Sequence, residues 1–176
     1  MLTSTLVPVD EYLRSSWHPD REYVDGAIAE RNLGDLLHSW LQTRFCEPLR
    51  ERGLHPFVNL RTGIKPNPVR VPDVLALRER PSGRILKRPP HIVVEILSPE
   101  DRIGYMADKI DDYLDFGIPN IWVVDPVRRA VSSCTRAGSQ VFTGEESTSD
   151  GLVSIPLDEI FRDMPEIADE EEQPTR

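Results

Sequence analysis

Two acidic residues stand inside apolar stretches of the sequence. Asp73 lies in residues 71–77, and Glu95 lies in residues 91–97. Both stretches are typical of buried strands. An ionised carboxylate is costly to bury, so such a group usually takes up a proton, pairs with a cation or binds a metal. Two acids of this kind, followed by Lys109 on a predicted helix, indicate a metal-dependent site that hydrolyses a phosphodiester.

The alternation of side chains along the two strands supports this interpretation. In residues 91–97, Glu95 shares a face with Val93 and Leu97, and Asp73 shares the face of Leu75 in residues 71–77. Pairing with an arginine would explain one buried acid. Two acids near the ends of neighbouring core strands favour a shared Mg²⁺ or Mn²⁺, since hard cations prefer oxygen ligands.

A basic segment separates the two strands. It contains Arg78, Arg80, Arg84, Lys87 and Arg88, opposed by Glu79. Because it follows the first acid and precedes the second, we predict phosphate contacts from Arg84, Lys87 and Arg88. The alternative is a solvated loop without a function in binding.

The elements that must position these residues follow from apolar periodicity and from turn residues. Helical spacing predicts a long helix over residues 35–50 and another over residues 102–116. Apolar runs predict strands at 56–64, 71–77, 91–97 and 121–124, and the Asp25-Gly26 pair predicts a hairpin within residues 21–30. Shorter segments predict helices at 8–13 and 156–161 and an antiparallel meander at about 128–136, 139–143 and 152–155. This order predicts one α/β domain around a mixed sheet.

Composition limits the classes of function. The chain has 176 residues and a formal net charge of -9, which argues against indiscriminate coating of nucleic acid. There is no apolar run long enough to cross a membrane and no secretory signal, and the two cysteines lack metal-ligand or redox spacing. We therefore predict a cytoplasmic protein without a membrane partner. The domain is expected to span residues 1–162, and the acidic tail 163–176 is expected to be disordered.

Several motifs together resemble the Uma-type family of the restriction-endonuclease-like, or PD-(D/E)xK, superfamily. The resemblance rests on Pro72-Asp73, residues 94–99, Lys109, Tyr113, Gly117 and residues 121–126, with upstream support at 22–26 and 38–42. It covers about residues 8–162. It implies a restriction-endonuclease-like fold, in which helices flank a mixed β-sheet.

The resemblance also implies a mechanism. Asp73 and Glu95 would ligate the metal together with the main-chain carbonyl of Ile96. The metal would make a water molecule more acidic and neutralise charge that develops on the phosphate. The implied reaction is hydrolysis of a phosphodiester bond.

The lysine departs from the general superfamily motif. That motif would place it two residues after Glu95, at Leu97, which is apolar here. The Uma-type proteins are similar to this chain in placing a lysine on the following helix, at Lys109. There it would orient water or stabilise the transition state. The alternative is a surface lysine beside Asp108 and Asp112.

Two further residues have alternative interpretations. Glu22 resembles an additional acid of the family, which would hold a second metal or its water; a supporting or helix-contacting role is the alternative. His38 lies on the flank of the first long helix, where it could hydrogen-bond a site carboxylate. The alternative for His38 is a packed or solvent-facing side chain.

The leading hypothesis is therefore a Mg²⁺-dependent endonuclease that acts on DNA, with RNA as an open alternative. A homodimer is expected. The hypothesis from a different class is a catalytically inactive binding or regulatory module with the same fold. Hydrolysis of another phosphoester is the third.

Overall fold

The computed structural model describes residues 6–16, 21–24, 26–30, 34–64, 68–83, 85–98 and 103–166. Arg84 lies outside the described residues. So do residues 167–176, which make up most of the predicted acidic tail. Within the described residues, no helix is both long enough and apolar enough to cross a membrane.

A mixed sheet forms the centre of the described fold. Its six strands lie in the order β10 (Gly138–Val141), β9 (Ala130–Thr135), β8 (Ile121–Asp125), β7 (Ile92–Ile96), β6 (Val74–Leu77) and β3 (His55–Val58). Strands β7 and β8 are parallel, and the other neighbouring pairs are antiparallel. Parallel neighbours require a crossover connection, and α3 (Ile103–Phe116) supplies it.

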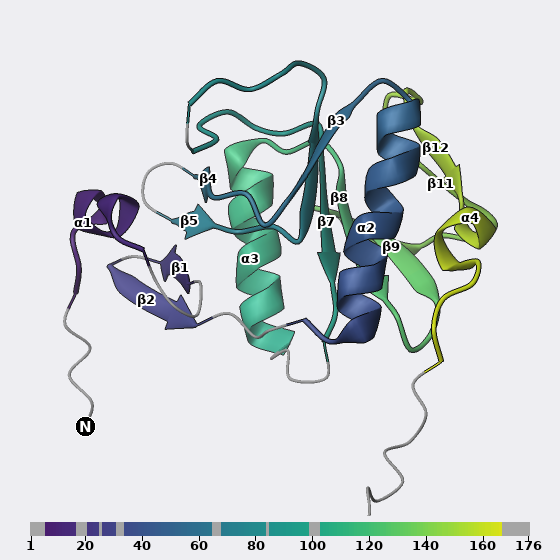
Figure 1. The fold of residues 1–176 in the computed structure, drawn as a ribbon, viewed down its shortest axis with the longest axis horizontal. Helices are drawn as coiled ribbons and strands as arrows, with labels where there is room; N and C mark the ends of the chain where they lie inside the picture. The colour runs from purple at the N-terminus through teal and green to yellow at the C-terminus, as the bar shows by residue number, and fades with distance from the viewer. Residues whose placement is uncertain are drawn as a thin grey trace, which may run out of the picture.

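Two long helices cover the two faces of this sheet. In Figure 1 the sheet is seen nearly edge-on between α3 and α2 (Leu36–Glu51). Ile92 and Val94 belong to the core cluster that contains Phe45 of α2, whereas Val93 belongs to the cluster that contains Tyr113 of α3. The alternation along β7 therefore directs odd-numbered residues, Glu95 among them, towards α3. The predicted mixed sheet flanked by helices is confirmed.

A smaller antiparallel sheet lies beside the first. Its order is β2 (Ala27–Glu30), β1 (Arg21–Val24), β5 (Val69–Arg70) and β4 (Thr62–Gly63). The predicted hairpin within residues 21–30 forms, with Arg21 opposite Glu30. Helix α1 (Val9–Arg14) packs on this sheet, because Tyr12 and Tyr23 form one cluster with ring centroids 5.4 Å apart. This sheet brings Glu22 and Arg70 next to α3.

Three predicted strands differ from the structure. The run predicted at 71–77 forms a strand only from Val74, so Asp73 lies just before β6. The run at 56–64 divides into β3 and β4, which belong to different sheets. Asn59 has a φ of 52°, a left-handed conformation that interrupts the strand. The strand predicted at 152–155 leaves the meander: β12 (Ser154–Pro156) pairs with β11 (Glu145–Ser147) in a separate hairpin, which leads into α4 (Leu157–Phe161).

Candidate active site

Glu95 and Lys109 meet between β7 and α3. The Glu95 side chain is 1% exposed, and its Oε2 lies 2.8 Å from Nζ of Lys109. Its Oε1 accepts a hydrogen bond of 2.5 Å from the hydroxyl of Tyr113, one turn further along the helix. The helical lysine thus points into the sheet rather than towards solvent, even though it comes 14 residues after the glutamate.

Asp73 lies next to Glu95 because of the strand register. Val74 of β6 opposes Val94 of β7, so the next antiparallel pair would be Asp73 and Glu95. Oδ2 of Asp73 accepts a hydrogen bond of 2.9 Å from the main-chain N–H of Ile96. Asp73, Glu95 and the main chain of Ile96 therefore lie together at one end of the sheet.

His38 contacts Asp73 from the opposite helix. Its Nε2 is 3.2 Å from Oδ1 of Asp73. Helix α2 begins at this point because the Asp35 side chain caps it, accepting a 2.8 Å hydrogen bond from the main-chain N–H of His38. The His38 side chain thus lies against a candidate site carboxylate, as the first of its two interpretations expects.

Glu22 of β1 is fully buried and receives four donors. Its Oε1 accepts from the main-chain N–H of Val71 at 2.7 Å and lies 3.3 Å from Nζ of Lys109. Its Oε2 accepts from Nη1 of Arg70 at 3.2 Å and from the hydroxyl of Tyr105. A carboxylate offers about four lone-pair directions. The four protein donors therefore fill its acceptor capacity, which favours a supporting role over that of a metal ligand.

Arg70 and Tyr105 were not identified from the sequence. The Arg70 guanidinium joins Glu22 to Asp112, with Nη2 2.6 Å from the Asp112 carboxylate, and it lies 5.2 Å from the centroid of the Tyr105 ring. The sequence could have indicated Tyr105, because Tyr105, Lys109 and Asp112 are three or four residues apart and therefore share a face of α3. For Arg70, the signal was a charge between two valines in an apolar stretch.

The buried charges change the protonation equilibria of the cluster. Burial raises the pKa of Glu95 to about 8. Burial opposes ionisation of Asp73 too, but the hydrogen bond from His38 and the charge of Lys109 outweigh it and lower the pKa to about 2. For Lys109, the carboxylates of Glu95 and Glu22 outweigh burial and raise the pKa above its usual value. The lysine is therefore held as a cation.

The chemistry of the donors fits a divalent cation. The cluster contains four carboxylates, on Glu22, Asp73, Glu95 and Asp112, and two permanent cations, on Arg70 and Lys109. When all are ionised, two negative charges are uncompensated. Among the described residues, no three His, Cys, Asp or Glu side chains are grouped so as to hold a metal. Two carboxylates with one main-chain oxygen would be enough protein ligands for Mg²⁺, because this ion typically keeps several water molecules as its other ligands.

The predicted phosphate contacts are not brought to these acids. Lys87 and Arg88 belong to the connection from β6 to β7, at the top of Figure 1. Asp73 precedes the start of β6, so the connection begins a full strand length away from it. Arg88 instead lies 3.1 Å from Glu79, and Arg84 is outside the described residues. Nearness in sequence was misleading, because the strand directions separate the loop from both acids.

Comparison with known proteins identifies a family and a similar fold. The model of the Uma2 family, described as "Putative restriction endonuclease", matches residues 9–164. None of the curated proteins matches the chain. A crystal structure of a "putative nuclease" from Anabaena variabilis is similar, with a TM-score of 0.75 and 21% identity over 88% of this chain and 97% of that one. At this identity, the likeness shows the fold alone.

Proposed function

The chain belongs to the Uma2 family of "putative restriction endonucleases", and from this we propose that it is a metal-dependent endonuclease that hydrolyses phosphodiester bonds in DNA. One observation carries the proposal most directly. The ammonium of Lys109 contacts Glu95, while Asp73 bonds to the main chain of the residue after Glu95. Two carboxylates and one lysine thus lie at the same end of the sheet, which supports a site for metal-assisted hydrolysis.

In this proposal, Asp73, Glu95 and the carbonyl of Ile96 would hold Mg²⁺ or Mn²⁺. When bound, such a cation supplies charge neutralisation at the phosphate and a more acidic water molecule. Lys109 presents a fixed positive charge beside the same carboxylates, where it would stabilise negative charge that develops on the substrate. His38 orients Asp73 through its 3.2 Å contact.

Glu22 is assigned a positioning role. Its contact with Lys109 is one of four that it makes, and the other three come from Val71, Arg70 and Tyr105. These donors fix the carboxylate before any substrate binds. The carboxylate in turn restricts the lysine ammonium to the space beside Glu95.

The proposal is tested by cleavage assays on purified protein. Plasmid DNA, single-stranded DNA and RNA are incubated with wild type, Asp73→Asn or Glu95→Gln in Mg²⁺, in Mn²⁺ or in EDTA. Asp111→Asn is the matched control, since Asp111 lies exposed on α3. We expect cleavage of DNA by wild type and by the control, about a hundredfold less by either site variant, and none in EDTA.

Two outcomes would overturn the proposed reaction at this site, and a third would overturn its substrate. Cleavage that persists unchanged in both site variants would come from something other than this site. No cleavage of any substrate in either metal would leave the fold without the proposed reaction. Cleavage of RNA alone would refute DNA as the substrate while keeping the chemistry.

The burial of the cluster favours a second candidate, a binding module that shares the fold but lacks catalysis. The Asp73 side chain is only 6% exposed, and protein donors already contact both of its oxygens. Calorimetric titration with Mn²⁺ separates the two candidates. Binding that disappears in Asp73→Asn supports the metal site, whereas no binding to wild type supports the module.

A further inference from the structure

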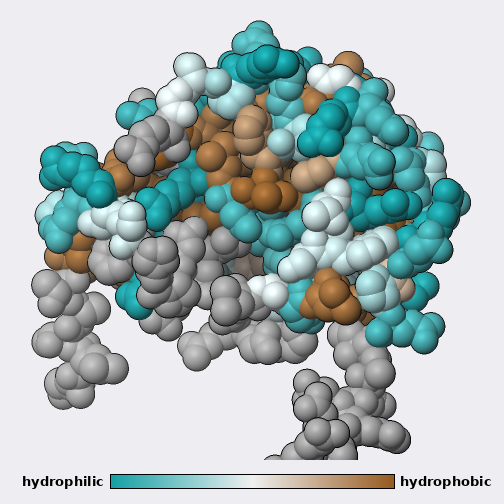
Figure 2. All heavy atoms as spheres, in the orientation of Figure 1, coloured by the Kyte–Doolittle hydropathy of each residue, from teal (hydrophilic) through white to brown (hydrophobic). Residues whose placement is uncertain are grey.

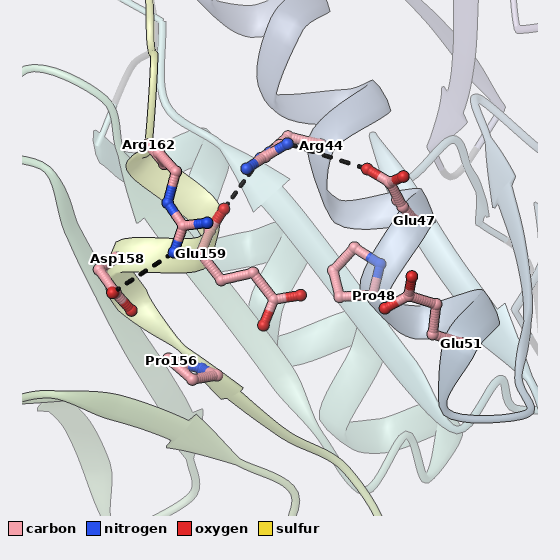
Figure 3. Close-up of a pocket in the computed structure, with 8 residues that line it drawn as sticks. All are labelled: Arg44, Glu47, Pro48, Glu51, Pro156, Asp158, Glu159 and Arg162. Carbon is pink, nitrogen blue, oxygen red and sulfur yellow. Dashed lines mark hydrogen bonds and ion pairs between the residues drawn. The ribbon is translucent and has the colours of Figure 1, made fainter.

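A cleft lies at the end of the sheet opposite to the acidic cluster. It has a volume of about 360 Å³ and lies where β6 ends and β7 begins; Arg78, Arg88 and His91 line it together with prolines. A second hollow of about 750 Å³, lined by Arg80 and Lys87, adjoins it through Glu79 and Arg88. We name the two together the basic cleft. Figure 2 shows hydrophilic residues along this top edge of the molecule.

The charge of the basic cleft is opposite to that of the whole chain. Arg78, Arg80, Lys87 and Arg88 face two acids, Glu79 and Asp150, so two positive charges remain in a chain whose net charge is -9. Arg78 pairs with Asp150, and Arg88 lies 3.1 Å from Glu79. Arg80 and Lys87 are exposed, and neither has an ion pair within the described part of the chain. These two cations are available to an external anion.

His91 adds a buried donor that lacks an acceptor. Its side chain is 5% exposed, and its Nδ1 accepts a 3.2 Å hydrogen bond from Nε of Arg78. Burial, with the charge of Arg78, lowers the pKa of His91, so the ring is neutral and its proton resides on Nε2. Nε2 has no hydrogen-bond partner among the described residues, and Asp150 is 3.7 Å away. A buried donor without an acceptor at hydrogen-bond distance is unfavourable, so an oxygen of a bound ligand within reach of Nε2 would be stabilising here.

We propose that the basic cleft binds the phosphodiester backbone of a nucleic acid, at a position separate from the candidate active site. Guanidinium groups and N–H donors are the usual partners of backbone phosphates. Arg78 is five positions after Asp73, which is roughly 17 Å of extended chain. That distance corresponds to about five base pairs of a duplex. The inference rests on the proposed function, because the bound backbone would belong to the molecule that is cut.

Equilibrium binding tests the cleft without requiring catalysis. Fluorescence anisotropy in EDTA measures the affinity for a labelled duplex of about 20 base pairs. The variant is Arg80→Glu with Lys87→Glu. The control is Arg128→Glu with Arg162→Glu, which changes the net charge equally at exposed arginines elsewhere. We expect the cleft variant to raise Kd about tenfold or more and to reduce the slope of log K against log salt by roughly 2, about 0.9 for each lost phosphate contact. Equal Kd values for the cleft variant and the control would overturn the inference.

Kinetics and NMR separate this inference from the proposed function. If wild type cleaves DNA, the cleft variant raises KM for the duplex but leaves kcat, and the hydrolysis of bis(p-nitrophenyl) phosphate, unchanged. If wild type cleaves nothing, the proposed function fails and the binding measurement still decides the cleft. The ¹⁵N shift of His91 Nε2 is expected to move on addition of the duplex. An equal response to the same concentration of inorganic phosphate would indicate a small-anion site and contradict backbone binding.

Discussion

Lys109 is the residue on which the candidate site depends most. It contacts Glu95 at 2.8 Å and Glu22 at 3.3 Å, all three side chains being buried. Removing it leaves two buried carboxylates with one fewer cation, a loss that typically costs about 3–5 kcal/mol. The lysine therefore contributes to stability as well as to the proposed chemistry.

We predict that Lys109→Met lowers the free energy of unfolding by this amount and lowers cleavage at least about a hundredfold. Adding Glu95→Gln removes the buried carboxyl that has lost its cationic partner, so the double variant should regain part of the stability but none of the activity. Urea unfolding and plasmid cleavage of the two single variants and the double variant measure this. Strictly additive stability losses would contradict the contact between the two side chains.

Glu146 is a buried acid outside the site. It is fully buried, neither oxygen has a hydrogen-bond partner among the described residues, and burial raises its pKa to about 9. The folded protein thus keeps a proton that the unfolded chain loses above its ordinary pKa of 4.5. The free energy of unfolding is therefore highest with respect to this group below pH 4.5. It falls by about 1.4 kcal/mol per pH unit as the pH rises from 4.5 towards 9.

We predict that Glu146→Gln is increasingly more stable than wild type as the pH rises from 5 to 8, because the amide cannot ionise. Urea midpoints at several pH values measure the difference. The exposed neighbour Glu145→Gln is the control, and its difference from wild type should stay constant. A constant difference for Glu146→Gln as well would show that this carboxyl does not retain its proton on folding.

At the scale of elements, the start of α2 controls the site through one glycine. A Cβ at Gly34 would lie 2.6 Å from Cδ2 and 2.8 Å from Cγ of His38, closer than real contacts allow. The imidazole would have to move, and it could not keep its 3.2 Å contact with Asp73. The absence of a side chain at position 34 thus allows His38 to reach the acid.

We therefore predict that Gly34→Ala lowers cleavage to the level of His38→Ala, and that the double variant is no worse than either single variant. Gly104→Ala is the control, because a Cβ there meets nothing within 4 Å, and alanine favours a helix by about 1 kcal/mol over glycine. Additive losses in the double variant would indicate that Gly34 acts independently of His38.

Elements with strong local signals were predicted well. The helix expected at 102–116 is α3, Ile103–Phe116, and the helix expected at 35–50 is α2, Leu36–Glu51. Apolar spacing and the capping residue Asp35 are local properties, so the sequence contains them. The division of 56–64 at Asn59 was missed, because its left-handed conformation is set by tertiary contacts, among them the hydrogen bond from its N–H to the carbonyl of Asp73.

At the scale of the whole molecule, opposite charges lie at opposite ends of one sheet. The acids lie where β6 begins and β7 ends, and the basic connection lies where β6 ends and β7 begins. The identities of Asp73 and Glu95 were readable from the sequence, because each charge interrupts an apolar run. The sequence did not reveal the location of Arg88 or the four partners of Glu22, since both depend on pairing between segments that are distant in the chain. The expected homodimer stays a prediction.

A crystal structure of the protein soaked in Mn²⁺ tests the central claim most directly, through its anomalous difference map. The account predicts a peak bonded to Asp73, Glu95 and the carbonyl oxygen of Ile96, with Glu22 still holding Lys109. No peak between the two acids at saturating Mn²⁺, or a peak that is ligated by Glu22 in their place, would contradict it.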